Sequence, residues 1–183
     1  MGSILAILAT GVVGYLLTKK RSVVTSNIAG YRQISNVKLT YYYVADLTLG
    51  SVPVYDKFGN FVIGISSASM TELILEGSGK LPDGRILNYY NGSRWSVLSP
   101  GSRPFGSYGN RLTEMGSIAV DPKLIQLGSV VYISALGIWV TAEDIGRAIK
   151  GAHIDLFTGT KSKARQYSSK TSTDLVVFDI TVQ

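Results

Sequence analysis

Three aspartates in the last third of the chain, Asp121, Asp144 and Asp155, are the residues whose type and spacing could support catalysis. Asp155 lies in the run HIDLF, eleven residues after Asp144. Each position also has a structural interpretation. Asp121 precedes Pro122, a pair typical of the start of a turn, and an Asp before a short helix, as Asp144 would be, is typical of an N-cap.

Asp155 has the local pattern of an acid in an apolar setting. On a strand it would share one face with His153 and Phe157, while its direct neighbours point to the other face. Loss of hydration there would raise the pKa of Asp155 and keep a fraction protonated near neutrality, and the charges of Asp144 and Asp121 would raise it further. Such an acid can protonate the leaving oxygen of a glycosidic bond. We interpret His153 as a packing residue.

Short runs of β-branched and aromatic residues between turn residues surround these aspartates. Strands are expected at residues 37–45, 72–76, 117–120, 129–134, 138–142, 153–157 and 175–182. Short helices are expected at residues 144–150 and 161–167, and a loop at 91–110. Many short strands with turn signals predict an all-β barrel or sandwich with small helices.

Composition excludes several kinds of site. The 183 residues contain no cysteine and one histidine, so thiol chemistry, disulfides and multi-histidine metal centres are ruled out. We expect neither a metal nor a cofactor. The net charge is +6, and Lys19, Lys20 and Arg21 supply three of the positive charges. No dense basic run with stacking aromatics remains elsewhere, which argues against a nucleic-acid partner.

The N-terminal segment predicts a membrane anchor. Residues 3–18 carry no charge, and as a helix they would span roughly 24 Å, which flanking lysines can extend across a bilayer. A cleaved signal peptide is the alternative, but Lys19 and its basic neighbours make a poor cleavage region. We therefore expect a transmembrane anchor over residues 1–21 and a tether over residues 22–36. Basic flanking residues favour a body that begins on the cytosolic side.

The runs GSIAVDPKLIQLGSVVYI and AEDIGRAIKGAHIDLF carry a combined pattern. The order of the aspartates, their spacing and the stretch AIKG resemble the three-aspartate (3D) domain of MltA-type membrane-bound lytic transglycosylases and related wall-acting proteins. Upstream, LILEGSGKLPDGRILNYYNG resembles part of that family's insert domain, and the strand TYYY resembles its first barrel strand. The family commonly has Asp-Thr-Gly-Gly where this chain has the run DIGR at residues 144–147. The two departures are Ile145 and Arg147.

The resemblance implies a six-stranded double-psi β-barrel formed by residues 37–45 and 113–183, with a small inserted β-rich lobe at residues 46–112. It also implies cleavage, without water, of the β-1,4 bond from N-acetylmuramic acid (MurNAc) to N-acetylglucosamine (GlcNAc), which leaves a 1,6-anhydromuramic end. Asp155 would be the acid and base, supported by Asp144 and Asp121. The substrate-binding residues expected by the same resemblance are Thr40, Tyr42, Glu76, Gly77, Ser78 and Lys150.

Peptidoglycan glycan strands would be the main partner, with the lipid bilayer bound through residues 3–18. The cytosolic flank and the external substrate are reconciled by the internal membrane of a bacterial virus, where a capsid or membrane protein would be a further partner. The alternative location is the periplasmic face of a bacterial membrane. Two other functions stay open: a non-catalytic glycan-binding module, and a structural virion membrane protein on the same barrel.

Overall fold

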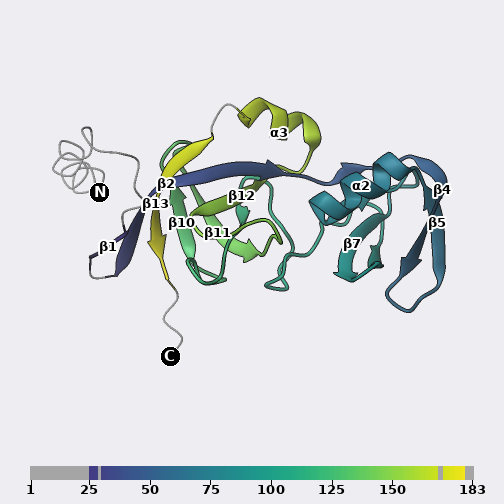
Figure 1. Ribbon diagram of the computed structural model, residues 1–183, viewed down its shortest axis with the longest axis horizontal. Coiled ribbons are helices and arrows are strands. Elements are labelled where there is room, and N and C mark those ends of the chain that lie inside the picture. The colour runs from purple at the N-terminus through teal and green to yellow at the C-terminus, as the bar shows by residue number, and fades with distance from the viewer. Residues whose placement is uncertain (1–24, 29, 169–170, 180–183) are drawn as a thin grey trace.

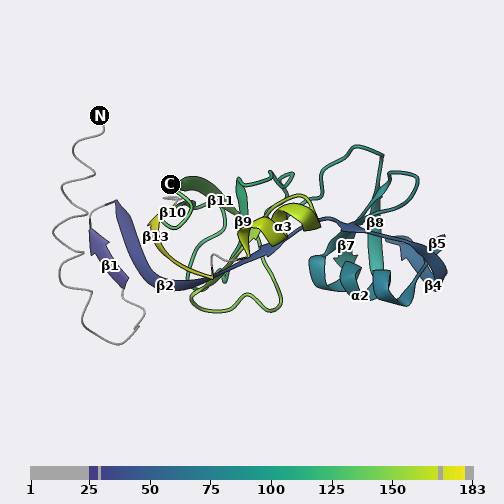
Figure 2. The same cartoon turned by 90° about the horizontal axis from the view of Figure 1, so that it is seen from above.

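The computed structural model describes residues 25–28, 30–168 and 171–179, which form an elongated molecule with two β-sheets along its long axis (Figure 1). A seven-stranded sheet occupies one end, and a six-stranded sheet with helix α2 (Ser67–Glu76) occupies the other. The long strand β2 (Tyr31–Tyr42) runs through the first sheet toward the second (Figure 2). The predicted mainly β class is confirmed.

Six strands of the first sheet close into a barrel. The sheet order is β1-β2-β12-β9-β11-β10-β13, and β13 also pairs with β2, which completes the ring. The pairs β2–β12 and β9–β11 are parallel, and the other pairs are antiparallel. Besides β2, the strands are β1 (Thr25–Ile28), β9 (Ser117–Ala119), β10 (Val130–Ile133), β11 (Ile138–Asp144), β12 (His153–Phe157) and β13 (Ser172–Phe178).

The packing of the barrel core fixes the direction of the candidate acid. Ile154 and Leu156 of β12 are fully buried in one cluster with Ile34 and Leu175. Successive strand residues point to opposite faces, so Asp155, between Ile154 and Leu156, points away from that interior. The aliphatic core therefore directs the carboxyl group away from the barrel interior.

The second lobe, defined here as strands β3–β8 with α2, is an open half-barrel. Its order is β3-β6-β7-β8-β4-β5. Its core contains Trp95, Leu73 and Leu87. Its strands are β3 (Ala45–Asp46), β4 (Leu49–Asp56), β5 (Phe61–Ile65), β6 (Ser78–Lys80), β7 (Ile86–Asn91) and β8 (Arg94–Leu98).

The predicted strand at residues 72–76 is wrong, because these residues end helix α2. The Ser66 hydroxyl caps this helix by accepting a hydrogen bond from the Ser69 amide at 3.1 Å, and Gly77 ends it in the left-handed conformation at φ 72°. Ser69 and Leu73, four residues apart, are its buried residues. A short apolar run alone does not separate helix from strand, and here the two caps decide.

The predicted helix at residues 144–150 is also wrong. Strand β11 extends to Asp144, and residues 145–150 form a loop with a turn. The Asp144 carboxylate accepts a hydrogen bond from the Ile145 amide at 2.9 Å. The Asp121 carboxylate accepts one from the Gly151 amide at 2.8 Å. Side-chain acceptors thus bind amides at both ends of the loop, in competition with helical hydrogen bonding.

The expected loop at residues 91–110 contains strand β8, so that expectation is wrong for this part. Strands β7 and β8 pair antiparallel around a turn at Gly92, whose φ is 51°. Trp95 of β8 is 2% exposed and packs in the core of the second lobe. Burial of that large side chain outweighs the surrounding glycines and serines.

The predicted tether at residues 22–36 is wrong for residues 25–28 and 31–36. The first of these form β1, which pairs with β2, and the second belong to β2, where Ile34 is fully buried in the barrel core. Arg32 forms an ion pair with Asp179 at 2.6 Å, between β2 and the residue after β13. Polar residues that alternate with buried ones on a strand resemble a tether in sequence.

The predicted anchor, residues 3–18, lies outside the described residues. Within residues 25–28, 30–168 and 171–179, none of the helices has the length and apolar character needed to cross a membrane. Helix α3 (Lys161–Tyr167) covers part of β2 in the barrel.

Candidate active site

Asp155 lies at the middle of β12, between two neighbouring strands. Its register partners are Thr40 of the parallel strand β2 and Ala119 of the antiparallel strand β9. The Thr40 hydroxyl (Oγ1) and Asp155 Oδ1 are 2.8 Å apart. The strand face that carries Asp155 also carries Phe157, which packs with Tyr42 and Ala119 in a small separate cluster. The carboxyl group is therefore held on both sides by backbone pairing.

The pKa of Asp155 is raised to about 6, first by burial and next by the negative charge of Asp144. The Thr40 hydrogen bond and the Lys38 charge act in the opposite direction. At pH 7 a group with this pKa is protonated in roughly one molecule in ten, against about one in a thousand for an ordinary Asp. The pKa of Asp155 is therefore raised, as predicted from the sequence.

Asp144 ends β11, and its carboxylate accepts hydrogen bonds from several donors. Its Oδ1 accepts from the Ser107 amide at 2.9 Å and the Ser107 hydroxyl at 2.8 Å, besides the Ile145 amide. Its Oδ2 accepts from the Tyr42 hydroxyl at 3.3 Å. Burial raises the pKa of Tyr42 well above its usual range, and Asp144 adds to this. Tyr42 is therefore a neutral phenol that donates to Asp144.

Asp121 has a different task. Its Oδ2 accepts from the Gly151 amide at 2.8 Å and its Oδ1 from the Lys123 amide at 3.0 Å. These two backbone hydrogen bonds hold the pKa of Asp121 below its usual value, and the Lys150 charge adds to this. Asp121 is not among the groups that shift Asp155, so its predicted contribution to that shift is wrong. It connects the end of β9 to the loop before β12.

Glu76 brings a second carboxyl group from the other lobe. It ends α2, and its Oε2 accepts from the Tyr43 amide at 3.0 Å. The pKa of Glu76 is raised to about 7, first by burial and then by the negative charges of Asp155 and Glu72, while the Tyr43 hydrogen bond acts in the opposite direction. Asp155 therefore ionises first, while Glu76 is still neutral, and its charge then opposes ionisation of Glu76. The pair titrates in two steps.

The remaining predicted binding residues differ in accessibility. Gly77 caps α2, and Ser78 on β6 is only 3% exposed, which leaves its hydroxyl buried. Lys150 is exposed and acts electrostatically on Asp121. Thr40 is also part of the wall of a cavity of about 310 Å³ between β2 and α3, which Lys161 and Arg165 help to line.

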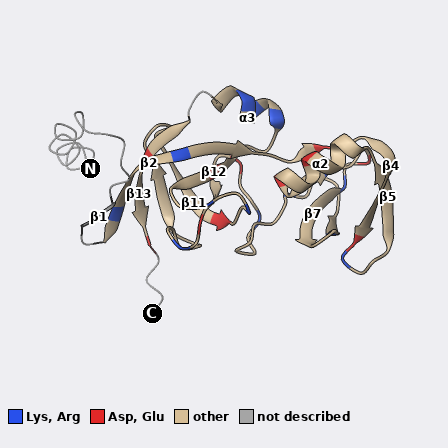
Figure 3. Ribbon diagram, in the orientation of Figure 1, with Lys and Arg blue, Asp and Glu red and all other residues tan. Residues whose placement is uncertain are grey.

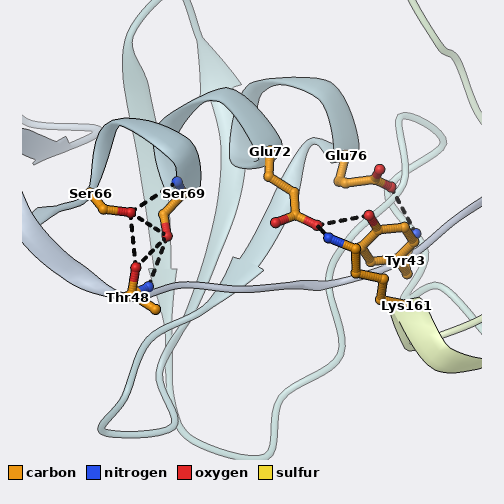
Figure 4. A network of polar contacts seen from close by, with 7 residues as sticks. All are labelled: Tyr43, Thr48, Ser66, Ser69, Glu72, Glu76 and Lys161. Atoms are coloured by element: carbon orange, nitrogen blue, oxygen red, sulfur yellow. Dashed lines mark hydrogen bonds and ion pairs between the residues drawn. The ribbon is translucent and has the colours of Figure 1, made fainter.

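A polar network joins the two lobes near the site (Figure 4). The Tyr43 hydroxyl donates to Glu72 Oε1 at 2.7 Å, and Lys161 forms an ion pair with the same oxygen at 2.6 Å. Tyr43 follows β2, Lys161 begins α3, and Glu72 lies on α2. Acidic residues lie at the end of β11 and on α2, whereas α3 carries basic residues (Figure 3).

Sequence reasoning missed the residues that support the aspartates, namely Lys38, Tyr43, Glu72, Ser107 and Lys161. None has a local signal, because each reaches the site from an element distant in the chain. Only the position of Tyr43 in the TYYY run of the strand predicted at residues 37–45 could have pointed to it. The structure also gives His153 a polar contact, 2.9 Å from its Nε2 to Thr40 Oγ1, which its assignment as a packing residue did not include.

Comparison with protein families places the aspartates in a known domain. Residues 116–179 match the family model described as the 3D domain. The fold is similar to solved lytic transglycosylase structures at low sequence identity. The chain thus contains a 3D domain, and its fold is that of MltA-type lytic transglycosylases.

Three solved structures illustrate the likeness. MltA from E. coli with bound chitohexaose aligns over 81% of this chain and 75% of that one, with TM-score 0.61 and 14% identity. The membrane-bound lytic murein transglycosylase of Agrobacterium tumefaciens aligns over 81% and 76%, with TM-score 0.55 and 14% identity. LtgG of Burkholderia pseudomallei aligns over 82% and 77%, with TM-score 0.52 and 18% identity.

Two curated relatives from Bacillus subtilis share a shorter segment. The cell wall-binding protein YocH is 52% identical over 54 residues, which are 30% of this chain and 18% of YocH. The putative cell wall shaping protein YabE is 48% identical over 54 residues, which are 30% of this chain and 13% of YabE. The match thus spans less than a fifth of either relative.

Proposed function

We propose that the chain is a peptidoglycan lytic transglycosylase with Asp155 as its acid and base. The observation that carries this proposal is a single carboxyl group with a pKa of about 6, held by two neighbouring strands inside a 3D domain. The shared fold with enzymes of this class supports it. The chitohexaose bound to MltA from E. coli and the similarity to the cell wall-binding protein YocH favour glycan strands of the bacterial wall as the partner.

One carboxyl group is sufficient for this reaction. Protonated Asp155 gives its proton to the oxygen between MurNAc C1 and GlcNAc C4, and the C1–O bond breaks. The Asp155 carboxylate then takes the proton from the 6-hydroxyl of the same MurNAc, whose oxygen bonds to C1. The products are a 1,6-anhydromuramic end and a free 4-hydroxyl, and Asp155 is protonated again. A hydrolase would need a second carboxylate to activate water or attack.

The other residues take supporting roles in this proposal. Asp144 tunes Asp155 by charge, and Asp121 holds the loop at residues 145–151 in place. Thr40 orients Asp155, and Tyr42 orients Asp144. Glu76 is partly exposed and Lys150 is exposed, so both side chains can contact a sugar. For Gly77 and Ser78, contact would be through the backbone, because the Ser78 hydroxyl is buried.

The finer architecture belongs to the same proposal. The two parallel pairs, β2–β12 and β9–β11, within a closed six-stranded ring support a double-psi topology. The lobe at residues 46–112 would then be an insertion between the first barrel strand and the rest of the barrel. Attachment to a membrane through residues 3–18, in a virion or at the periplasmic face, rests on the sequence pattern.

The competing function is glycan binding without cleavage, which the name of YocH favours. Mass spectrometry of purified peptidoglycan after digestion separates the possibilities. Anhydromuropeptides support the proposal, and reducing ends would mean hydrolysis. Intact peptidoglycan that nevertheless co-sediments with the protein would replace the proposal with a binding role, whereas neither products nor binding would favour a structural role on this barrel.

A further inference from the structure

The hydroxyl group of Thr40 lies between two titratable side chains. Its Oγ1 is 2.8 Å from Asp155 Oδ1 and 2.9 Å from His153 Nε2. The register explains this arrangement, since Thr40 pairs with Asp155 and Lys38 pairs with His153 along the parallel strands β2 and β12. His153 and Asp155 share one strand face because they are two residues apart.

A hydroxyl carries one proton, so it cannot donate to both neighbours. If Asp155 is ionised, Thr40 donates to it, and His153 Nε2 must bear a proton to keep its own bond to Oγ1. If Asp155 is protonated, it donates to Oγ1, and Thr40 can then donate to a bare Nε2. The protonation of the imidazole and that of the carboxyl group are therefore linked through Thr40.

The surroundings of His153 favour the second arrangement. The backbone carbonyl of Ala148 accepts a hydrogen bond from the ring, and with Nε2 facing Thr40, Nδ1 is the nitrogen that donates to it. Burial lowers the pKa of His153, and the Lys38 charge lowers it further. The neutral ring with its proton on Nδ1 presents a bare Nε2 to Thr40.

We propose that His153 is a positioning residue that acts through Thr40 to hold Asp155 in its protonated, donating form. This role builds on the proposed function, because it concerns the state of the acid before bond cleavage. Among the groups that face Asp155, Lys38 on β2 and Asp144 on β11 act on its pKa by charge. Tyr42 on β2 and Glu76 on α2 are neutral while Asp155 ionises, and the charge of Asp155 in turn raises the pKa of both. His153 acts instead through a shared hydrogen bond.

The first test needs no activity. His153 is the only histidine of the chain, so ring nitrogen spectra of the full-length protein, made without a histidine tag, report this residue alone. We expect the ring signals to change in two steps with pH, one of them near pH 6 as Asp155 ionises. In Asp155→Asn that step should disappear. One titration step, identical in the wild type and in Asp155→Asn, would overturn the proposal.

The second test is the pH profile of cleavage. Removal of the acceptor in His153→Leu should move the alkaline limb toward acid by about 0.5 to 1 pH unit, because protonated Asp155 loses one hydrogen-bonded arrangement. His153→Gln, whose amide oxygen can accept from Thr40, should keep the limb in place. In a Thr40→Val background, His153→Leu should shift nothing further.

These outcomes separate the two proposals. A folded His153→Leu variant with the wild-type limb, or a His153→Gln variant shifted equally, would overturn the relay while leaving the transglycosylase proposal intact. Absence of anhydromuropeptides from the wild type would overturn the proposed function, whereas the nitrogen spectra would still decide whether His153 and Asp155 are linked.

Discussion

The barrel and the second lobe are both built around a β-sheet, but the edges of the two sheets differ. The barrel closes on itself through the β2–β13 pair, whereas the second lobe keeps two edge strands, β3 and β5. Asp155 has a paired strand on each side, while Glu76 lies at the end of a helix. The second lobe also exposes Phe58 and Leu75 at 78% and 77%.

This difference indicates that the barrel and the second lobe have separate roles in the proposed function. A closed ring fixes each strand by two neighbours, so a side chain on it has little freedom to change its direction. An open half-barrel can supply a wall and a nearby charge without setting the geometry of the acid. Substitutions in the barrel should therefore abolish or retune the chemistry, and those in the second lobe should act mainly on binding.

The largest expected effect is on cleavage by Asp155→Asn. The amide keeps the shape of the side chain but cannot transfer the proton, so the rate should fall at least ~10²-fold. Muropeptide release from purified peptidoglycan measures this. Turnover close to that of the wild type would show that the barrel acid has been misassigned.

The same variant should be more stable at alkaline pH. Because the pKa of Asp155 is raised when folded, its contribution to stability is fully present below about pH 4, the unfolded value, and is lost as the pH rises through about 6. Above pH 6, Asp155→Asn should exceed the wild type by about 1–3 kcal/mol. Urea unfolding at pH 4 and pH 8 checks that the gain is confined to the higher pH.

Ile34→Ala tests whether β2 belongs to the barrel from Tyr31 onward. Ile34 is fully buried, so its truncation should lower the free energy of unfolding by about 2–5 kcal/mol. Phe58→Ala in the exposed turn of the second lobe is the matched control, with a change of about 0.5 kcal/mol or less. Equal stability of the two variants would return residues 31–36 to the role of a tether.

Asp144→Asn should reduce cleavage roughly tenfold, because orientation is weakened while the proton donor remains. Its amide oxygen can still accept from Ser107, but the negative charge is gone. The pKa of Asp155 should then fall, and the alkaline limb of the rate should move toward acid. A limb that stays in place in an active variant would mean that Asp144 does not act on Asp155 by charge.

The smallest effect is expected for Glu76→Gln, the counterpart in the second lobe. Its amide oxygen can still accept from the Tyr43 amide, so the helix end should be kept. Since Glu76 is neutral while Asp155 ionises, the limb near pH 6 should stay in place and only KM should rise, by about twofold to fivefold. A shift as large as that of Asp144→Asn would erase the distinction between the two lobes.

Some of this molecule could be predicted from local pattern. The alternation in HIDLF predicted both the strand and the separation of Asp155 from its aliphatic neighbours, and the structure has both. The predictions at residues 72–76 and 144–150 were wrong for a local reason. Their conformation depends on caps and on carboxylates that bind backbone amides, and these weigh little in a count of apolar residues.

The sequence by itself determined that Asp155 lies within a strand and that Asp121 and Asp144 lie close to strand ends in a mainly β chain. It could do so because β periodicity and turn residues are local properties. It could not separate their roles. Only the tertiary structure gave each aspartate its hydrogen-bond partners. Asp121 accepts from two backbone amides, Asp144 accepts from Ser107 and Tyr42, and Asp155 is hydrogen-bonded to Thr40. The physical reason is that a carboxyl group's pKa follows burial and nearby charge, and both are set by residues far away in the chain.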